Sequence, residues 1–192
     1  MGITIHYKGK IDDVEMIDNL ICEISDICND MGWDSTIIKK EKNDINHPPI
    51  KGIIFTIHKG CDVVGFIFDD NGFLRAPISI QYYDESDKYQ LIVSVKTQFS
   101  SPDIHVVLIK LLKYIKSKYI SNLEVTDEGE YLETSDMERL KYLFDFLDNK
   151  INMFRDILDG NKEIFSKSDS PELIADKIEK LLIKYMSNNK SG

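Results

Sequence analysis

The sequence predicts an α+β protein, with a single antiparallel sheet of about five or six strands and helices packed on one face. Strand-like alternation of apolar and polar residues dominates the first half of the chain, and helical spacing dominates the second half. There is no regular strand–helix–strand alternation of the kind that builds a parallel sheet. The predicted element order is therefore β-α-β-meander-α-β-α-α.

The first three elements follow from the pattern near the N-terminus. Residues 3–9 read ITIHYKG, and their period-two alternation predicts a half-buried strand. After Asp12 and Asp13, either of which can cap a helix, apolar residues recur at helical spacing up to Gly32. Residues 33–41 then predict a short second strand.

A meander of strands is predicted in the middle of the chain. Each strand is an apolar or alternating run bounded by turn-forming residues, and Asn71-Gly72 favours a tight hairpin turn. Pro77 indicates an edge strand or a bulge. The predicted strands cover residues 51–60, 62–70, 73–83 and 89–99.

Helices are predicted for most of the chain after residue 100. Ser101 is placed to cap a helix over 100–120, with Pro102 at the first helical position, where its missing N–H costs nothing. A short extended piece over 123–134 precedes a long helix that Gly160 ends. The predicted organisation is an α+β domain over 1–158, a linker over 159–170, a C-terminal helix over 171–187 that packs on the domain or on a partner chain, and a frayed tail over 188–192.

Charge and composition exclude several classes of function. A formal net charge of −9 disfavours binding to nucleic acid or to an anionic membrane. The chain has no long apolar run and no signal-peptide pattern, and its three cysteines do not suit a secreted disulfide framework, so we expect a cytoplasmic protein. No phosphate-binding glycine motif and no metal-ligand spacing occurs, so we expect no cofactor and no metal.

The histidines are the first candidates for chemistry at neutral pH. His6 and His58 occupy equivalent places in TIHY and TIHK, on the strand faces opposite the large apolar residues. If these strands are neighbours, the two imidazoles can share a polar cleft with Lys96 and Gln98. The alternative is a solvated sheet face without a chemical role, and the composition of the strands favours that alternative.

Residues 100–105, SSPDIH, place a hydroxyl, a carboxylate and an imidazole close together in the chain. Most of them have a structural explanation, because Ser101 caps the helix and Asp103 complements the helix dipole. His105 lies at the edge of the apolar stripe, which is typical of a partly buried structural histidine. The remaining hypothesis for this segment is an anion-binding site at the helix N-terminus, which faces a sheet that carries Lys96.

Seven acidic residues lie between Glu124 and Glu138, within a segment, 121–160, whose net charge is −7. The run fits a solvated, helix-capping stretch, a docking surface for a basic protein partner, or a divalent-cation site, although the spacing of an EF-hand loop is missing. We favour the solvated stretch and place docking second. The candidate partner-binding residues are Asp127, Glu128, Glu130 and Glu133.

Three segments in a fixed order resemble a family of uncharacterised bacterial proteins: ITIHYKGKI, VSVKTQF with SPDIH, and LEVTDEGEYLET. The resemblance covers about residues 1–155 and leaves the last helix outside. It implies that the strand-to-helix junction and the acidic segment are shared features of one fold. It implies no activity, substrate or catalytic residue.

The sequence supports three hypotheses of function. The leading one is a non-enzymatic, acidic protein-interaction or regulatory module of the immunity or antitoxin-like kind, since acidic charge is concentrated and no catalytic signature is recognisable. The second is a ligand-binding protein or hydrolase that uses the polar face of the sheet, and it requires convergence of the candidates His6, His58, Lys96, Gln98 and His105. The third is a homodimer through the C-terminal helix.

Overall fold

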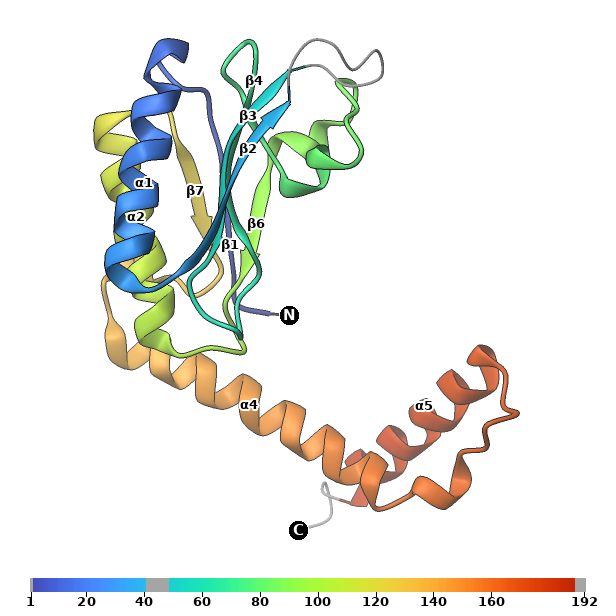
Figure 1. The fold of residues 1–192 in the computed structure, drawn as a ribbon. Helices are drawn as coiled ribbons and strands as arrows, with labels where there is room; N and C mark the ends of the chain where they lie inside the picture. The colour runs from blue at the N-terminus through green and yellow to red at the C-terminus, as the bar shows by residue number, and fades with distance from the viewer. Residues whose placement is uncertain (1, 41–48, 189–192) are drawn as a thin grey trace. The chain divides into compact units, whose positions relative to one another are not determined.

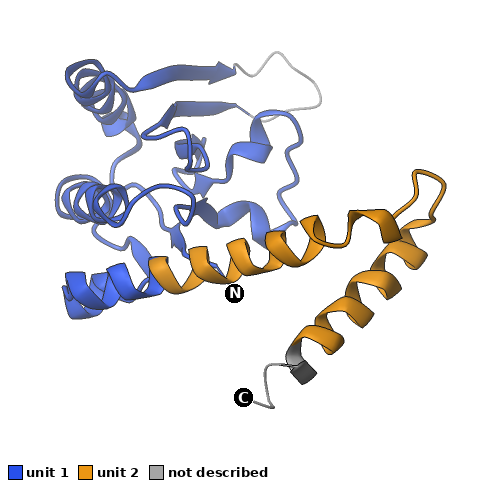
Figure 2. Cartoon of the chain, turned by 90° about the horizontal axis from the view of Figure 1, so that it is seen from below, with its two compact units in different colours: residues 1–144 blue, residues 145–192 orange. Residues whose placement is uncertain are grey.

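The computed structural model of the chain describes residues 2–40 and 49–188, without the side chains of residues 186–188. The chain divides into two compact units, Met1–Phe144 (unit 1) and Asp145–Gly192 (unit 2), and the boundary falls inside one long helix (Figure 2). Each unit is described by itself below.

Seven strands and five α-helices form within the described residues, which confirms the predicted α+β class (Figure 1). The strands are β1 (Thr4–Lys8), β2 (Asp34–Lys40), β3 (Ile50–Thr56), β4 (Val64–Asp69), β5 (Leu74–Arg75), β6 (Val93–Lys96) and β7 (Glu124–Asp127). The α-helices are α1 (Ile17–Met31), α2 (Pro102–Lys118), α3 (Tyr131–Thr134), α4 (Met137–Asp159) and α5 (Pro171–Asn188). Short 3-10 helices are η1 (Val14–Met16), η2 (Pro77–Ile80), η3 (Lys88–Leu91) and η4 (Lys162–Ile164).

The strands form two antiparallel sheets, so the prediction of one sheet with five or six strands is wrong. One sheet has the order β6-β1-β7 and the other the order β2-β3-β4-β5. They join where the chain continues beyond β1: the Leu74 N–H donates to the Gly9 carbonyl (2.9 Å), and the Ile11 N–H donates to the Gly72 carbonyl (2.9 Å). The alternation of apolar and polar residues identifies a strand but not the strand with which it pairs. The division into two sheets was therefore not predictable from the sequence.

Two strands are much shorter than predicted. Of residues 73–83, only β5 is extended, because Pro77 occupies the first turn of η2. Proline suits that position, since its fixed φ matches a helical turn and its missing N–H would have had no partner there. Of residues 89–99, the first part forms η3 and β6 retains only four residues. Pro77 therefore marks a helical turn rather than an edge strand or a bulge.

The helix boundaries that were predicted from capping residues are confirmed. The Asp13 side chain accepts from the Glu15 N–H (2.9 Å) and starts η1, which leads into α1. Gly32 ends α1 with φ at +66°, a left-handed conformation that glycine adopts without steric cost. The Ser101 hydroxyl accepts from the Ile104 N–H (3.4 Å) at the start of α2.

The two long helices of unit 1, α1 and α2, lie on the same face of the sheets (Figure 1). Glu23 on α1 ties them together, because its carboxylate accepts hydrogen bonds from Lys118 (2.7 Å), Tyr114 and Tyr119 of α2. Burial acts to raise the pKa of Glu23, but these hydrogen bonds outweigh it and lower the pKa to about 2. The core between helices and sheets includes Ile5, Tyr7, Leu20, Ile24, Phe55, Phe66, Leu108, Leu112 and Ile115.

Unit 2 consists of the later part of α4, then η4 and α5 (Figure 2). Its buried hydrophobic side chains, among those described, are only Ile157 and Leu181. The predicted linker 159–170 contains η4, and the predicted C-terminal helix corresponds to α5. From residue 189 onward, the predicted frayed tail lies outside the described residues.

Tyr7 connects the two sheets of unit 1. Its hydroxyl donates to the Gly65 carbonyl (2.8 Å) and accepts from the Gly65 N–H (3.2 Å), and both residues are buried. Burial raises the pKa of Tyr7 well above its ordinary value, so the phenol stays protonated and keeps its donor.

We expect Tyr7→Phe to lower the free energy of unfolding by about 1–3 kcal/mol, because it leaves a buried N–H and a buried C=O of Gly65 without partners. Urea denaturation followed by circular dichroism measures the change. Tyr89→Phe is the matched control, since Tyr89 is 84% exposed. Equal stabilities of the two variants would contradict the role assigned to the Tyr7 hydroxyl.

Candidate functional site

A polar constellation lies on the outer face of the three-stranded sheet, away from the helices. In the register of this sheet His6 lies opposite Ser94 on β6 and opposite Thr126 on β7. The His6 Nδ1 is 2.8 Å from the Ser94 Oγ, and its Nε2 is 3.8 Å from the Glu128 Oε1. The His6 and Glu128 side chains are 35% and 42% exposed, so the group is open to solvent.

A hollow of about 220 Å³ adjoins this group. His6, Lys8 and Thr126 line it together with Tyr7, Ile92 and Glu124. Lys8 and Glu124 form an ion pair (2.9 Å) at its edge. The arrangement offers a hydroxyl, an imidazole and charges of both signs beside a small depression, which is enough to hold a small polar molecule.

His105 lies in a different place, fully buried beneath the inner face of the same sheet. Its Nδ1 is 2.8 Å from the Thr97 Oγ1, and its Nε2 is 2.9 Å from the Asp127 Oδ1. The Nε2 contact is not a well-directed hydrogen bond, since Nε2 has no partner that meets the angular requirements of one. We therefore describe it as a close electrostatic contact between two side chains with no exposed surface.

Asp127 is held by the backbone as well as by His105. Its carboxylate accepts from the Gly129 N–H (2.7 Å) and the Leu132 N–H (2.9 Å). Burial acts to raise the pKa of Asp127, but His105 and the two backbone donors outweigh it and lower the pKa. A side chain at Gly129 would meet the His105 Nε2 at 2.9 Å, so the close approach of this loop to the ring requires glycine.

The polar face and the buried histidine do not form one site. Ile5 lies opposite both Val95 and Asp127 in the sheet register, and therefore shares their inner face, whereas His6 projects to the outer face. His105 contacts Asp127 and so lies on the inner side of the sheet. His6 and His105 are therefore separated by the sheet itself and cannot act on one substrate.

The remaining candidates are also dispersed. Lys96 lies opposite Thr4 and shares the outer face with His6. Gln98 is buried, and its Oε1 accepts from the Ile3 N–H (3.3 Å). His58 follows β3 in the other sheet, where its Nδ1 accepts from the Gly60 N–H (3.0 Å) within a turn. The five candidates therefore do not converge, because His58 lies beyond a strand of the other sheet and His105 lies beneath the inner face of this one.

The acidic segment is structured, and most of its acids already have contacts. Asp127 is buried, so it is not available to a partner. Glu130 stands in the left-handed region (φ 57°) before α3 and pairs with Arg139. Glu128, Glu130 and Glu133 are exposed and remain the accessible members of the predicted partner-binding set.

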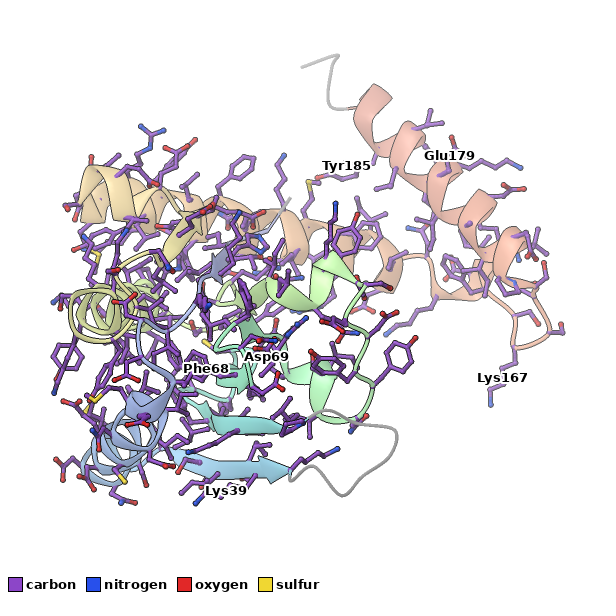
Figure 3. All side chains as sticks on the ribbon, turned by 90° about the horizontal axis from the view of Figure 1, so that it is seen from above. Lys39, Phe68, Asp69, Lys167, Glu179 and Tyr185 are labelled. Atoms are coloured by element: carbon purple, nitrogen blue, oxygen red, sulfur yellow. The ribbon has the colours of Figure 1, made fainter. Side chains whose placement is uncertain are left out.

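A second buried charge pair belongs to the β4–β5 turn. Asp69 accepts from Arg75 Nε (2.9 Å) and Nη2 (2.7 Å) with one oxygen, and from the Asn71 and Phe73 N–H groups with the other. Arg75 also lies over the Tyr83 ring. Figure 3 labels Asp69 at this turn. These contacts account for the pair as a structural element.

Sequence reasoning did not pair Ser94 with His6 or Thr97 with His105. The sequence contains a signal that Asp127 is buried. It lies two residues after Val125, and the period-two alternation of a strand places both side chains on one face. Ser94 likewise shares the alternation of Lys96 on the polar face. The pairing with His6 depends on a strand register between segments 88 residues apart.

Comparison with protein-family models, curated proteins and solved structures finds no match. The resemblance to a bacterial family therefore remains a prediction. In the described ranges no helix is both long and apolar enough to span a membrane. Nor do the described His, Cys, Asp and Glu side chains gather into a group of three that would hold a metal ion.

We expect Asp127→Asn to lower the free energy of unfolding by about 2–4 kcal/mol at neutral pH, because it weakens a buried network whose other members stay in place. The folded-state pKa of Asp127 is below its unfolded value. Its charge therefore stabilises the fold above about pH 4, and that contribution is lost as the pH falls through the folded pKa.

Urea titrations between about pH 2 and pH 7 test this expectation. The loss of stability on acidification will be smaller in Asp127→Asn than in the unchanged chain. Asp26→Asn, at an exposed position on α1, is the matched control and will reproduce the unchanged profile. An Asp127→Asn profile parallel to that of the control would refute the assignment.

Proposed function

We propose that this chain is a non-enzymatic protein-interaction or regulatory module, and that unit 2 carries its principal partner surface. The observation that supports the proposal is that few apolar side chains of unit 2 are buried. Of the large apolar side chains described there, only Ile157 and Leu181 are buried, others are half-buried, and six are at least a third exposed: Phe146, Phe154, Ile164, Leu173, Ile183 and Tyr185. Two helices with so little buried area gain stability by covering that surface.

A groove between α4 and α5 fits the same proposal. It measures about 580 Å³ and combines apolar with polar side chains. Its lining includes Met153, Ile157 and Leu181 together with Asn149, Asn152 and Asp156. An apolar floor with polar neighbours is typical of a surface that receives an amphipathic segment of another protein.

The charge of the chain favours a basic partner. Glu128 and Glu133 are accessible in unit 1, and the whole chain carries a net charge of −9. Opposite charge on the partner accelerates association and discriminates against acidic competitors. We therefore propose a partner that has both a basic surface and an apolar segment, in keeping with the immunity or antitoxin-like role expected from the sequence.

Affinity capture with the full chain from a lysate of the source cells tests the proposal. We expect a specific partner, and we expect Leu173→Asp/Ile183→Asp to reduce its capture at least about tenfold, because charge is placed on the apolar surface of unit 2. The matched control is Val63→Asp/Ile78→Asp, which changes apolar side chains of comparable exposure in unit 1. Unfolding curves establish that both variants are folded.

Charge reversal forms a second arm of this experiment. Glu128→Lys/Glu133→Lys will weaken capture, and the weakening will diminish at high salt. Glu15→Lys/Glu85→Lys makes the same change of charge at exposed positions elsewhere and will leave capture nearly unchanged. If no partner is captured specifically, or if the unit 2 variant captures it normally, the proposal fails.

A second candidate function, ligand binding or hydrolysis on the polar sheet face, is supported by the contact between Ser94 and His6. A hydroxyl 2.8 Å from an imidazole, with Glu128 near the other ring nitrogen, has the residue types of an activated nucleophile. We place it second because β1 pairs with strands on both sides, so its backbone N–H groups are committed to the sheet rather than to an oxyanion.

Labelling with a fluorophosphonate probe separates the two candidates. A nucleophilic Ser94 will react covalently, and Ser94→Ala and His6→Ala will each abolish the labelling. Ser168→Ala, a change at an exposed serine of unit 2, is the control. An unlabelled chain would eliminate the hydrolase candidate and leave the interaction module unaffected.

A further inference from the structure

Strand β2 is an open edge of the four-stranded sheet. It stands first in the order β2-β3-β4-β5, and its backbone pairs with β3 and with no other segment among the described residues. In Figures 1 and 3 no other helix or strand of the described residues lies beside its outer edge, and Figure 3 labels Lys39 on this strand. Alternate residues of such a strand direct N–H and C=O groups away from the sheet.

This edge lacks most of the features that protect edge strands. The pairing with β3 runs through seven consecutive residues without a bulge, and the strand contains no proline. It also exposes Ile37, at 50%. A regular, exposed edge of this length is suited to receive a further strand.

We infer that β2 pairs antiparallel with β2 of a second copy of this chain, about a twofold axis at Ile37. The observation that selects this occupant is the charge pattern of the strand, DSTIIKK. In that register Asp34 lies opposite Lys40 of the second copy. The twofold symmetry generates a second, identical pair between Lys40 of the first copy and Asp34 of the second. Ile37 meets its own equivalent at the centre.

The pairing is consistent on both faces of the sheet. Thr36 lies opposite Ile38 of the second copy, and Ser35 lies opposite Lys39, so no like charges face each other directly. Two four-stranded sheets become one continuous sheet of eight strands. The contact is isologous, which is the commonest basis of a closed dimer.

This interface is independent of the proposed function, because it uses residues of unit 1 alone, whereas the proposed partner surface belongs to unit 2. It also differs from the dimer through the C-terminal helix that the sequence suggested. The two dimers make opposite predictions for Leu173→Asp/Ile183→Asp. Pairing through β2 predicts that this unit 2 variant still dimerises.

Sedimentation equilibrium of the full chain tests the inference. We expect a reversible dimer of twice the 22.2 kDa chain mass. Asp34→Lys will raise the dimer dissociation constant at least about tenfold, because two attractive pairs become repulsive. Asp26→Lys, with the same change of charge on an exposed position of α1, is the matched control and will dimerise normally.

A charge swap completes the test. Asp34→Lys/Lys40→Asp restores opposite charges across the axis and will recover dimerisation relative to Asp34→Lys. The Lys40 Nζ also donates to the Ile80 carbonyl, so unfolding curves must establish that the double variant is folded. If the double variant proves unfolded, the cross-linking experiment below decides the question.

Oxidative cross-linking reads the register directly. In a Cys22→Ser background, Ile37→Cys will form a disulfide-linked dimer, because residues directly opposite in an antiparallel pair have Cα atoms about 4.5–5.5 Å apart. Lys39→Cys is the control, since its symmetry equivalent is displaced by four residues, about 13 Å along the strand. A monomer at all concentrations, or equal cross-linking of both variants, would overturn the inference.

Discussion

The buried phenol of Tyr7 is the contact on which the architecture of unit 1 depends. It lies on the central strand of one sheet and bonds both backbone groups of Gly65 in the other. A polar atom at that depth needs hydrogen-bond partners, and Gly65 of the second sheet supplies both a donor and an acceptor. The same strand continues into the backbone pairs of Gly9 and Ile11 that join the sheets at their end. The helices then cover a face whose shape is already determined.

The helices of unit 1 were predictable from the sequence, because capping residues act on the backbone close to themselves. Asp13, Gly32 and Ser101 act through hydrogen bonds or dihedral angles within a few residues of themselves. The sheets were less readable. Pro77 is compatible with an edge strand, a bulge or a helical turn, and the packing around it selected the turn. Strand partners were not predictable, since the alternation in β1 is the same whichever strands lie beside it.

The candidate site, like the sheets, was predictable only where the evidence is local in the sequence. A helical wheel predicted His105 to be a partly buried structural histidine, and in the structure the side chain is fully buried. Asp127 was misassigned to the surface because a carboxylate in an acidic run resembles its exposed neighbours. Its partner lies on a helix 22 residues earlier in the chain, and only the fold brings the two together. The surfaces open to solvent are instead the outer sheet face, the edge of β2 and the helices of unit 2, and these are the surfaces to which the proposals assign binding.

The position of β1 in the chain has a consequence for biosynthesis. Its partner β7 ends at Asp127, so the ribosome must add about 120 residues, roughly 6–24 s of translation, before the central strand has neighbours on both sides. During that interval Ile3 and the apolar side of β1, with Ile5 and Tyr7, lack the complete three-stranded sheet in which they are buried. A growing chain with exposed apolar surface and unpaired strand edges is prone to aggregate, so the order of the strands places this risk early in synthesis.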